Sequence, residues 1–296
     1  MIYYLKKVNA VLYHDKAGER MDLLGQKLTL EGIRYERGCK QPETEKAEKT
    51  ESPGTLWVTD SPGQATAWKK EGKPVLFYFY EEPGEKLSAA SKQRNPDFCV
   101  EYAMEKPEEL DALFLENIYR RLVKIPWEIV RTKRCIVRET IPTDIEPLLA
   151  IYAEPSVTRY MEPICKESED AHAAHAVLNA YIEKVYPFYG YGIWSILDRE
   201  DGKVIGRAGF SVGEAPDCPE LGYCITPKKQ GKGLAGEVCS ALLAYAKEEL
   251  LFQRVCAVTD RENAASAAIC RHLGFEEKET FEKDGREFIV FRKELW

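Results

Sequence analysis

Residues 220–236, ELGYCITPKKQGKGLAG, form the stretch that most constrains how this chain can fold. Residues 221–226 are a short apolar run suited to a buried strand, which Pro227 ends. Two glycines, Gly231 and Gly233, then open a segment whose apolar residues recur at helical spacing. Those apolar positions are Leu234, Val238, Ala241, Leu242, Tyr245 and Ala246. The stretch therefore predicts a strand, a glycine-rich turn and a long helix in immediate succession.

The turn between this strand and this helix predicts an anion site. The first N–H groups of a helix lack acceptors within the helix and carry partial positive charge. Because Gly231 and Gly233 have no Cβ, an anion could come close to those N–H groups. Lys228, Lys229 and Lys232 add positive charge to a chain that is acidic overall. The predicted ligand is a phosphate or pyrophosphate; alternatively, the glycines serve only the geometry of the turn.

The turn has neither the GxxxxGK[ST] spacing of a P-loop nor a GxGxxG pattern. Residues 230–235, QGKGLA, instead resemble the (Arg/Gln)-x-x-Gly-x-(Gly/Ala) pyrophosphate loop of the GNAT acetyltransferases, which bind acetyl-coenzyme A (acetyl-CoA). Residues 134–144, RCIVRETIPTD, look like the first strand and turn of that family. Residues 263–275, NAASAAICRHLGF, look like its asparagine-bearing helix ending in Gly-Phe. The three pieces follow the family's order, and the resemblance covers about residues 133–296.

The resemblance implies the GNAT fold, an α/β (α+β) fold with a mixed central sheet, and a set of residues for acetyl-CoA. In that fold the strand before the loop separates from the strand after the central helix, and the gap holds the pantetheine arm. The residues expected to bind acetyl-CoA are Tyr223, Cys224 and Ile225 at the strand edge, Gln230, Gly231, Lys232, Gly233, Leu234 and Ala235 in the loop, and Asn263. Asn263 could instead act only as the N-cap of its helix, or do both.

The resemblance also implies transfer of an acetyl group to an amine. The amine must be neutral to attack, so a base should take its proton, and the departing thiolate benefits from an acid. Glu220 matches the glutamate of the ribosomal-protein N-terminal acetyltransferase branch, so we expect it to act as base through water; alternatively it is an exposed carboxylate at a strand end. Many members carry a tyrosine acid seven residues after the asparagine, where this chain has Cys270. The acid stays open between Ser266, which matches the serine of that branch, Cys270, Tyr223 and solvent.

Acidic residues precede a helix expected at about residues 169–185, which in the GNAT fold flanks the acceptor pocket. They are Glu162, Glu167, Glu169 and Asp170, and their charge would favour a cationic amine. His172 and His175 stand three apart on this helix, and we interpret them as an exposed face rather than a metal pair.

The length of 296 residues suggests two domains, which we place at residues 1–130 and 131–296. Residues 1–33 read as largely helical, and residues 55–59, 74–80 and 98–103 read as strands separated by helices and loops. We therefore expect a small Rossmann-like α/β domain before the GNAT domain. Asp60-Ser61-Pro62 is typical of a helix start, and we interpret Asp60 as the cap. Similarity to dehalogenase-like or flavodoxin-like lobes is weak, because the aspartates of a dehalogenase-like phosphatase are missing.

Charge and cysteine content narrow the classes of partner. The formal net charge of −7 disfavours nucleic acid and anionic membranes, and no apolar run reaches bilayer-spanning length. Nine cysteines without a CxxC pair are typical of a reduced, cytoplasmic protein rather than of a disulfide framework or a metal site. We expect a small amine, a protein N-terminus or a lysine as acceptor and no metal, and the sequence does not predict the oligomeric state.

These features together favour an acetyl-CoA-dependent N-acetyltransferase that acts on a primary amine by direct attack, without an acyl-enzyme. A second hypothesis is a non-catalytic acyl-CoA sensor, because the expected tyrosine is replaced by Cys270. A third is that the N-terminal domain has a phosphatase-like or nucleotide-binding activity of its own.

Overall fold

The computed structural model describes residues 8–13, 18–30, 35–37, 54–78, 102–104, 110, 112–161, 171–212 and 218–296. The chain divides into two compact units, Tyr3–Trp127 and Glu128–Trp296. No helix within the described ranges combines the length and apolarity needed to cross a lipid bilayer.

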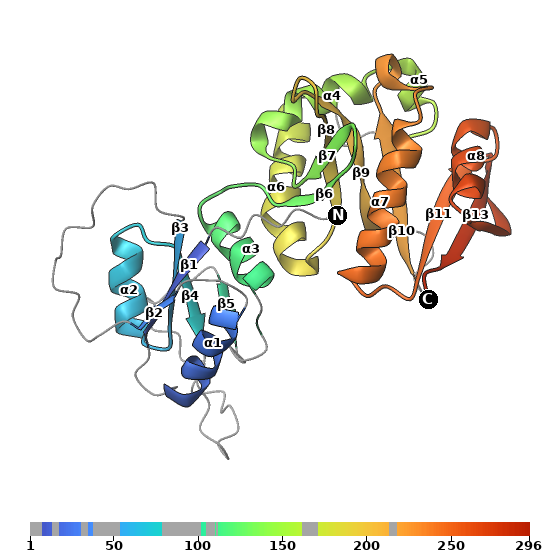
Figure 1. Ribbon diagram of the computed structural model, residues 1–296. Coiled ribbons are helices and arrows are strands. Elements are labelled where there is room, and N and C mark those ends of the chain that lie inside the picture. Colours follow the sequence, from blue (N-terminus) through green and yellow to red (C-terminus); the bar gives the residue numbers. More distant parts are fainter. Residues whose placement is uncertain are drawn as a thin grey trace. The chain divides into compact units, whose positions relative to one another are not determined.

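The first unit is built on a five-stranded sheet with the order β2-β1-β3-β4-β5 (Figure 1). The strands are β1 (Val8–Tyr13), β2 (Tyr35–Arg37), β3 (Gly54–Thr59), β4 (Val75–Tyr78) and β5 (Tyr102–Met104). All four neighbouring pairs run parallel. This order with parallel strands is that of flavodoxin-like, doubly wound sheets, so the prediction of a small Rossmann-like α/β architecture is confirmed.

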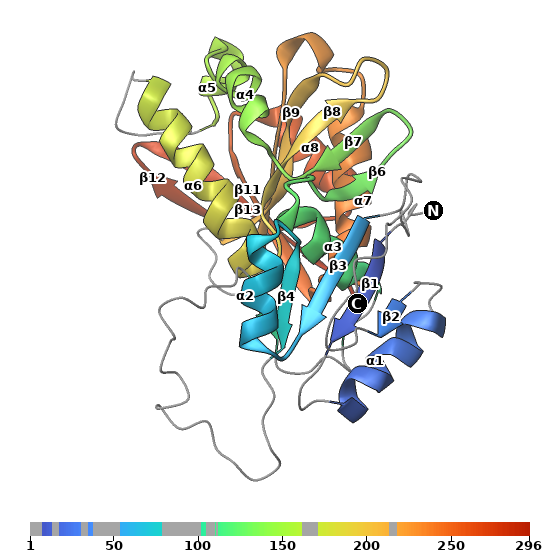
Figure 2. The same ribbon diagram turned by 90° about the vertical axis from the view of Figure 1, so that its left-hand side faces the viewer.

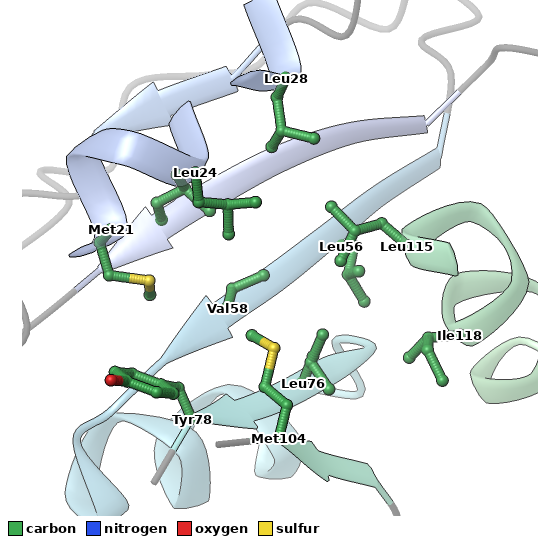
Figure 3. Close-up of a cluster of buried hydrophobic side chains, with 11 residues drawn as sticks. Met21, Leu24, Leu28, Leu56, Val58, Leu76, Tyr78, Met104, Leu115 and Ile118 are labelled. Carbon is green, nitrogen blue, oxygen red and sulfur yellow. The ribbon is translucent and has the colours of Figure 1, made fainter. Parts of the chain in front are cut away.

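Helices cover both faces of this sheet. They are α1 (Gly18–Leu30), α2 (Pro62–Lys70) and α3 (Ala112–Leu122). Figure 3 shows side chains of α1 and α3 meeting Leu56 and Val58 of β3 and Leu76 of β4 in one buried cluster. On the other face Trp68 of α2 packs with Phe77 of β4. Alternate residues of β4 thus enter different cores, as expected for a strand buried on both sides.

Two predictions for this unit were wrong in detail. Residues 18–30 form helix α1 as expected, but residues 8–13, also expected to be helical, form the interior strand β1, paired with both β2 and β3. Hydrogen bonds from two neighbouring strands outweigh a local preference for helix, which is a weak guide on its own. The N-cap of α2 is Ser61, whose side chain accepts from the N–H of Gln64, and not Asp60. Residues 79–80 and 98–101 of the expected strands lie outside the described residues.

The second unit carries an eight-stranded mixed sheet with the order β12-β13-β11-β10-β9-β8-β7-β6. The strands are β6 (Glu128–Arg131), β7 (Cys135–Arg138), β8 (Ile193–Asp198), β9 (Val204–Val212), β10 (Pro219–Ile225), β11 (Arg254–Asp260), β12 (Glu276–Lys283) and β13 (Arg286–Glu294). Among the described strand pairs of this second sheet, β10–β11 is parallel and the others are antiparallel. The predicted mixed central sheet is therefore confirmed.

Helices lie on both faces of this sheet as well. They are η2 (Pro142–Asp144), α4 (Ile145–Tyr152), α5 (Pro155–Thr158), α6 (Ala171–Tyr189), η3 (Pro227–Lys229), α7 (Leu234–Glu248) and α8 (Ala264–His272). Trp194 of β8 meets Tyr245 of α7, whereas the next residue, Ser195, donates a hydrogen bond to Asp144 beside α4. Successive side chains of a strand point to opposite faces, so we name these the α7 face and the α4 face. Figure 2 shows α6 and α7 on opposite sides of the sheet.

Candidate active site

Strands β10 and β11 part in the middle of the second sheet. In the described residues they pair through Glu220 and Cys256 alone. β10 remains paired with β9 along its whole length, and β11 remains paired with β13 from Arg254 to Asp260. Beyond Glu220, the edge of β10 that faces the gap is therefore unpaired with β11, which leaves room for an extended ligand to bind its backbone groups. Residues 223–225, which we expect to hold the pantetheine arm, lie on this edge.

A glycine-rich loop lies directly after this edge. Gly231 and Gly233 have left-handed backbones, with φ of 70° and 73°, and Gly233 is the N-cap of α7. A Cβ at Gly231 or Gly236 would meet no atom within 4 Å. The first N–H groups of the 15-residue helix α7 thus face open space, where an anion can approach them. The loop fits a phosphate group in both shape and charge.

Two polar side chains of the loop are engaged within the protein. The Gln230 side chain donates from Nε2 to the carbonyl oxygen of Ile225 at 2.7 Å, which ties the loop to the end of β10. Lys229 forms an ion pair with Asp198 of β8, so its charge is compensated. The hydrogen bond from Lys229 lowers the pKa of the Asp198 carboxyl. The exposed Lys228 and Lys232 remain beside the loop.

Arg134, which the sequence analysis did not assign to the site, braces this loop from the turn between β6 and β7. Its Nη1 donates to the carbonyl oxygen of Lys232 at 2.7 Å, and its Nε donates to Glu237 of α7 at 2.7 Å. Its Nη2 lies 3.7 Å from the place where a Cβ of Gly233 would be. Burial would raise the pKa of Glu237, but hydrogen bonds from Thr132 and Arg134 outweigh burial and lower it. No sequence signal links residues this far apart in the chain.

On the α7 face, Tyr223 of β10 meets α8. The Tyr223 hydroxyl donates to the Ser266 hydroxyl oxygen at 3.0 Å, and the Ser266 N–H donates to Oδ1 of Asn263 at 3.1 Å. Asn263 is the N-cap of α8, which is one of the two roles expected for it. Burial raises the pKa of Tyr223 well above its ordinary value, so the phenol stays protonated and able to donate a hydrogen bond.

Cys270 lies one helical turn after Ser266 on the same side of α8. The residue is 3% exposed, and burial raises the pKa of its thiol to about 11. Electrostatic interaction with the Cys270 and Cys239 thiols also contributes to the raised pKa of Tyr223. The structure thus gathers Tyr223, Ser266 and Cys270 on one side of the gap, with all three in their neutral forms.

Glu220 lies on the opposite face. Alternation along β10 puts Glu220, Gly222 and Cys224 on the α4 face, where Cys224 packs with Ile151 of α4 and Val157 of α5. Glu220 therefore stands at the last residue pair before β10 and β11 separate, on the other side of the sheet from Ser266. A proton acceptor on one face and hydrogen-bond donors on the other flank the gap, an arrangement suited to group transfer.

The remaining predictions concern acidic residues and metals. Glu162, Glu167, Glu169 and Asp170 lie outside the described residues. His175 Nε2 lies 2.7 Å from Oε1 of Glu146, so this histidine has a partner on α4. In the described part of the chain, no group of three or more His, Cys, Asp and Glu residues could hold a metal ion.

Comparison with known proteins identifies the domain that holds these residues. Residues 134–276 match the model described as acetyltransferase (GNAT) domain. The protein named "Uncharacterized N-acetyltransferase YoaA" of Bacillus subtilis (strain 168) is 28% identical over 153 residues, which are 51% of this chain and 85% of the relative. The [Ribosomal protein uS5]-alanine N-acetyltransferase of Escherichia coli (strain K12) is 29% identical over 166 residues, 54% of this chain and 84% of the relative.

A solved GNAT-family acetyltransferase from Bacillus anthracis is 18% identical, with a TM-score of 0.48, and the match covers 56% of this chain and 98% of that one. The region matched by the family model holds the parted strands, the glycine-rich loop and α8. Residues 134–276 therefore form a GNAT acetyltransferase domain, and over this region the chain is similar to proteins named N-acetyltransferases.

Proposed function

We propose that this chain transfers the acetyl group of acetyl-CoA to a primary amine by direct attack. The observation that carries the proposal is the parting of β10 from β11 directly before the glycine-rich loop of α7. A strand edge can bind the extended pantetheine arm through backbone groups, and a helix start can bind the pyrophosphate. The two features adjoin, in the order that the arm and the pyrophosphate have in coenzyme A.

The loop would bind the pyrophosphate mainly through backbone N–H groups of residues 231–235. Lys232 adds positive charge, Arg134 holds the Lys232 carbonyl in place, and Gln230 fixes the loop against β10. The edge at Tyr223, Cys224 and Ile225 would bind the arm, with the Asn263 side-chain amide on the opposite side of the gap. The N–H groups of Leu234 and Ala235 belong to the first turn of α7 and point toward the same ligand.

The reaction needs one bond to form as another breaks. The amine nitrogen attacks the acetyl carbonyl carbon, the C–N bond forms, and the C–S bond breaks with its electron pair leaving on sulfur. Glu220, on the α4 face, accepts the amine proton through water. Tyr223, on the α7 face, turns its hydroxyl from Ser266 toward the departing sulfur. Because burial raises the pKa of Tyr223, we assign it the donation of a hydrogen bond, and the thiolate takes its proton from solvent.

The sensor hypothesis rested on Cys270 standing where many family members have a tyrosine. In this chain the Tyr223 hydroxyl, from β10, reaches Ser266 one turn before Cys270, so a phenol comes to this side of the gap from another element. This contact favours an enzyme over a sensor. A small amine, a lysine or a protein N-terminus remains the proposed acceptor, and one relative is named for an alanine of a ribosomal protein. The free buried cysteines suit the proposed cytoplasmic location.

Calorimetric titration with acetyl-CoA tests the binding part of the proposal. We expect the native chain to bind, and Gly231→Ala to weaken binding about tenfold or more, because a Cβ enters the space of the pyrophosphate. Gly202→Ala is the matched control: Gly202 also has a left-handed backbone, φ 69°, and no neighbour within 4 Å, but it lies in the β8–β9 turn. Absence of acetyl-CoA binding by the native chain would contradict the proposal.

Thiol release during turnover tests the catalytic part. We expect Glu220→Gln to lower kcat by about 10²–10⁴ while leaving the Kd for acetyl-CoA unchanged, since it removes only the proton acceptor. A native chain that binds acetyl-CoA but transfers acetyl to no amine would support the sensor instead.

A further inference from the structure

Arg207 of β9 is a buried cation without an acidic partner. The residue is 6% exposed, and no carboxylate lies within ion-pair distance of it in the part of the chain that the structure describes. Its Nη2 donates to the carbonyl oxygen of Ile193 at 3.1 Å, and its buried Nε has no hydrogen-bond partner. An unpaired buried charge is strongly unfavourable, so a residue kept in this state calls for a partner that arrives from outside.

The groups around Arg207 do not supply a negative charge. Tyr152 of α4 and Tyr181 and Tyr186 of α6 surround it, and its guanidinium carbon lies 5.5 Å from the centre of the Tyr181 ring. Burial raises the pKa of all three phenols, that of Tyr186 to about 12, even though the charge of Arg207 opposes the rise. The three tyrosines are therefore neutral at physiological pH.

The guanidinium of Arg207 extends along the sheet toward Gly222 of β10. Arg207 is paired with Ser195 of β8, yet it donates to Ile193, which is paired with Gly209. Its side chain thus extends along the sheet to the row in which Gly209 is paired with Gly222 of β10. A Cβ at Gly222 would meet only the Cδ1 atom of Ile193, at 3.8 Å. On the α4 face, then, the guanidinium reaches a bare stretch of backbone.

This bare backbone lies where the acceptor must come. Gly222 stands midway between Glu220, the proposed base, and Cys224, which lies in the arm-binding edge, and all three are on the α4 face. An amine that approaches Glu220 over Gly222 places its other substituents next to Arg207. A guanidinium presents a planar fork of donors that matches a carboxylate. The Nε of Arg207 has no partner among the described residues, whereas its Nη2 donates to Ile193 and the side chain also forms a hydrogen bond with Tyr152.

We propose that Arg207 recognises a carboxylate of the acceptor, so that the substrate is an amine that also carries a negative charge. The inference rests on the proposed function and names its substrate class. The carboxylate belongs either to an amino acid or to an acidic residue near the N-terminus of a peptide. The cationic amine suggested by the acidic residues of the sequence is then disfavoured, because Arg207 would repel it.

Stability without any substrate gives the first test, on the full chain. We expect Arg207→Met to keep or raise the Tm, because it removes an uncompensated buried charge and retains an apolar stem. Arg138→Met is the matched control: Arg138 is a largely buried arginine on the same face, paired with Asp144 at 2.6 Å. Its loss should lower the Tm by leaving Asp144 unpaired. A fall in Tm for Arg207→Met as large as that for Arg138→Met would mark Arg207 as merely structural and overturn the inference.

Substrate preference gives the second test. L-alanine is compared with L-alaninamide, and the dipeptide Ala-Glu with Ala-Gln, by kcat/KM with acetyl-CoA in excess. We expect the carboxylate member of at least one pair to exceed its amide at least tenfold, and the excess to disappear in Arg207→Met and shrink in Arg207→Lys. The carboxylate-to-amide ratio of kcat/KM for the native chain is divided by the same ratio for the variant, which cancels the differing basicities of the amines. A preference within the first pair indicates an amino acid as acceptor, and a preference within the second pair indicates a peptide.

The outcomes separate this inference from the function on which it rests. A native chain that binds acetyl-CoA but prefers no carboxylate probe over its amide overturns the role of Arg207 and leaves the acetyltransferase proposal standing. A preference that survives Arg207→Met also overturns it. Absence of acetyl-CoA binding by the native chain would overturn both the role of Arg207 and the acetyltransferase proposal.

Discussion

Neighbouring residues of β10 serve opposite sides of the sheet. Glu220 lies on the α4 face, where the acceptor would enter, while Tyr223 lies on the α7 face and contacts Ser266 of α8. Because successive side chains of a strand point to opposite faces, a proton acceptor and a hydrogen-bond donor within four residues of chain lie on different sides of the sheet. Each can then act on a different partner, the amine and the thiolate, without neutralising the other.

The Tyr223 hydroxyl can be tested by a single substitution. We expect Tyr223→Phe to lower kcat about 10²-fold, as loss of one donor to a developing negative charge typically does, with the Kd for acetyl-CoA nearly unchanged. Steady-state kinetics and calorimetry measure the two quantities. Ser266→Ala, which removes the present partner of Tyr223 but keeps the phenol, should have a much smaller effect. A Phe variant with native kcat would mean that the thiolate is stabilised elsewhere.

At the scale of elements, the turn between β6 and β7 supports the loop before α7. Arg134 joins them through Lys232 and Glu237, which makes the position of the loop depend on an element about a hundred residues away in the chain. Held this way, the loop needs less ordering when the pyrophosphate binds, and such preorganisation favours affinity.

We therefore expect Arg134→Met to raise the KM for acetyl-CoA about tenfold with little change in kcat, because the loop is remote from the reacting carbonyl. Acetyl-pantetheine, which lacks the pyrophosphate, should react equally well with the native chain and the variant. Arg131→Met is the control, since Arg131 forms a comparable surface ion pair with Glu128 in the neighbouring strand β6. Equal losses with both acetyl donors would show instead that Arg134 acts on the fold as a whole.

At the scale of the whole molecule, several buried thiols and phenols hold their protons more tightly when folded. Burial raises the pKa of Cys224 to about 11, of Cys270 to about 11 and of Tyr186 to about 12. In the unfolded chain the thiols lose their protons near their ordinary pKa, about 8.5. The unfolded state thus binds fewer protons between these values, and stability falls as pH rises.

We expect the free energy of unfolding to be nearly constant from about pH 6 to about pH 8.5 and to fall steadily toward pH 11. Urea unfolding at a series of pH values measures this, with thiols kept reduced. Cys270→Ala should lessen the slope in that range, because it removes one group whose pKa rises on folding. A flat profile up to pH 11 would show that the buried thiols titrate normally.

Local pattern was enough for the parts of the fold that are continuous in the chain. Strand β10, its glycine-rich turn and helix α7 follow one another without interruption, so periodicity and two glycines predicted them. The same holds for the N-cap Asn263 of α8. Strand β1 was missed, because its six residues are held in an extended conformation by pairing with two neighbouring strands, and the local sequence does not indicate that pairing.

The sequence by local pattern, then, predicted the α/β architecture of the first unit, and through the family resemblance it predicted the mixed sheet and the residues proposed to face coenzyme A. Tertiary structure alone decided which of these residues meet. It brought Tyr223 to Ser266, put Glu220 on the other face, added Arg134 to the loop and left Arg207 without a counter-charge among the described residues. These facts depend on strand register and on contacts across the sheet, and burial and charge pairing are properties of distances in space rather than of spacing along the chain.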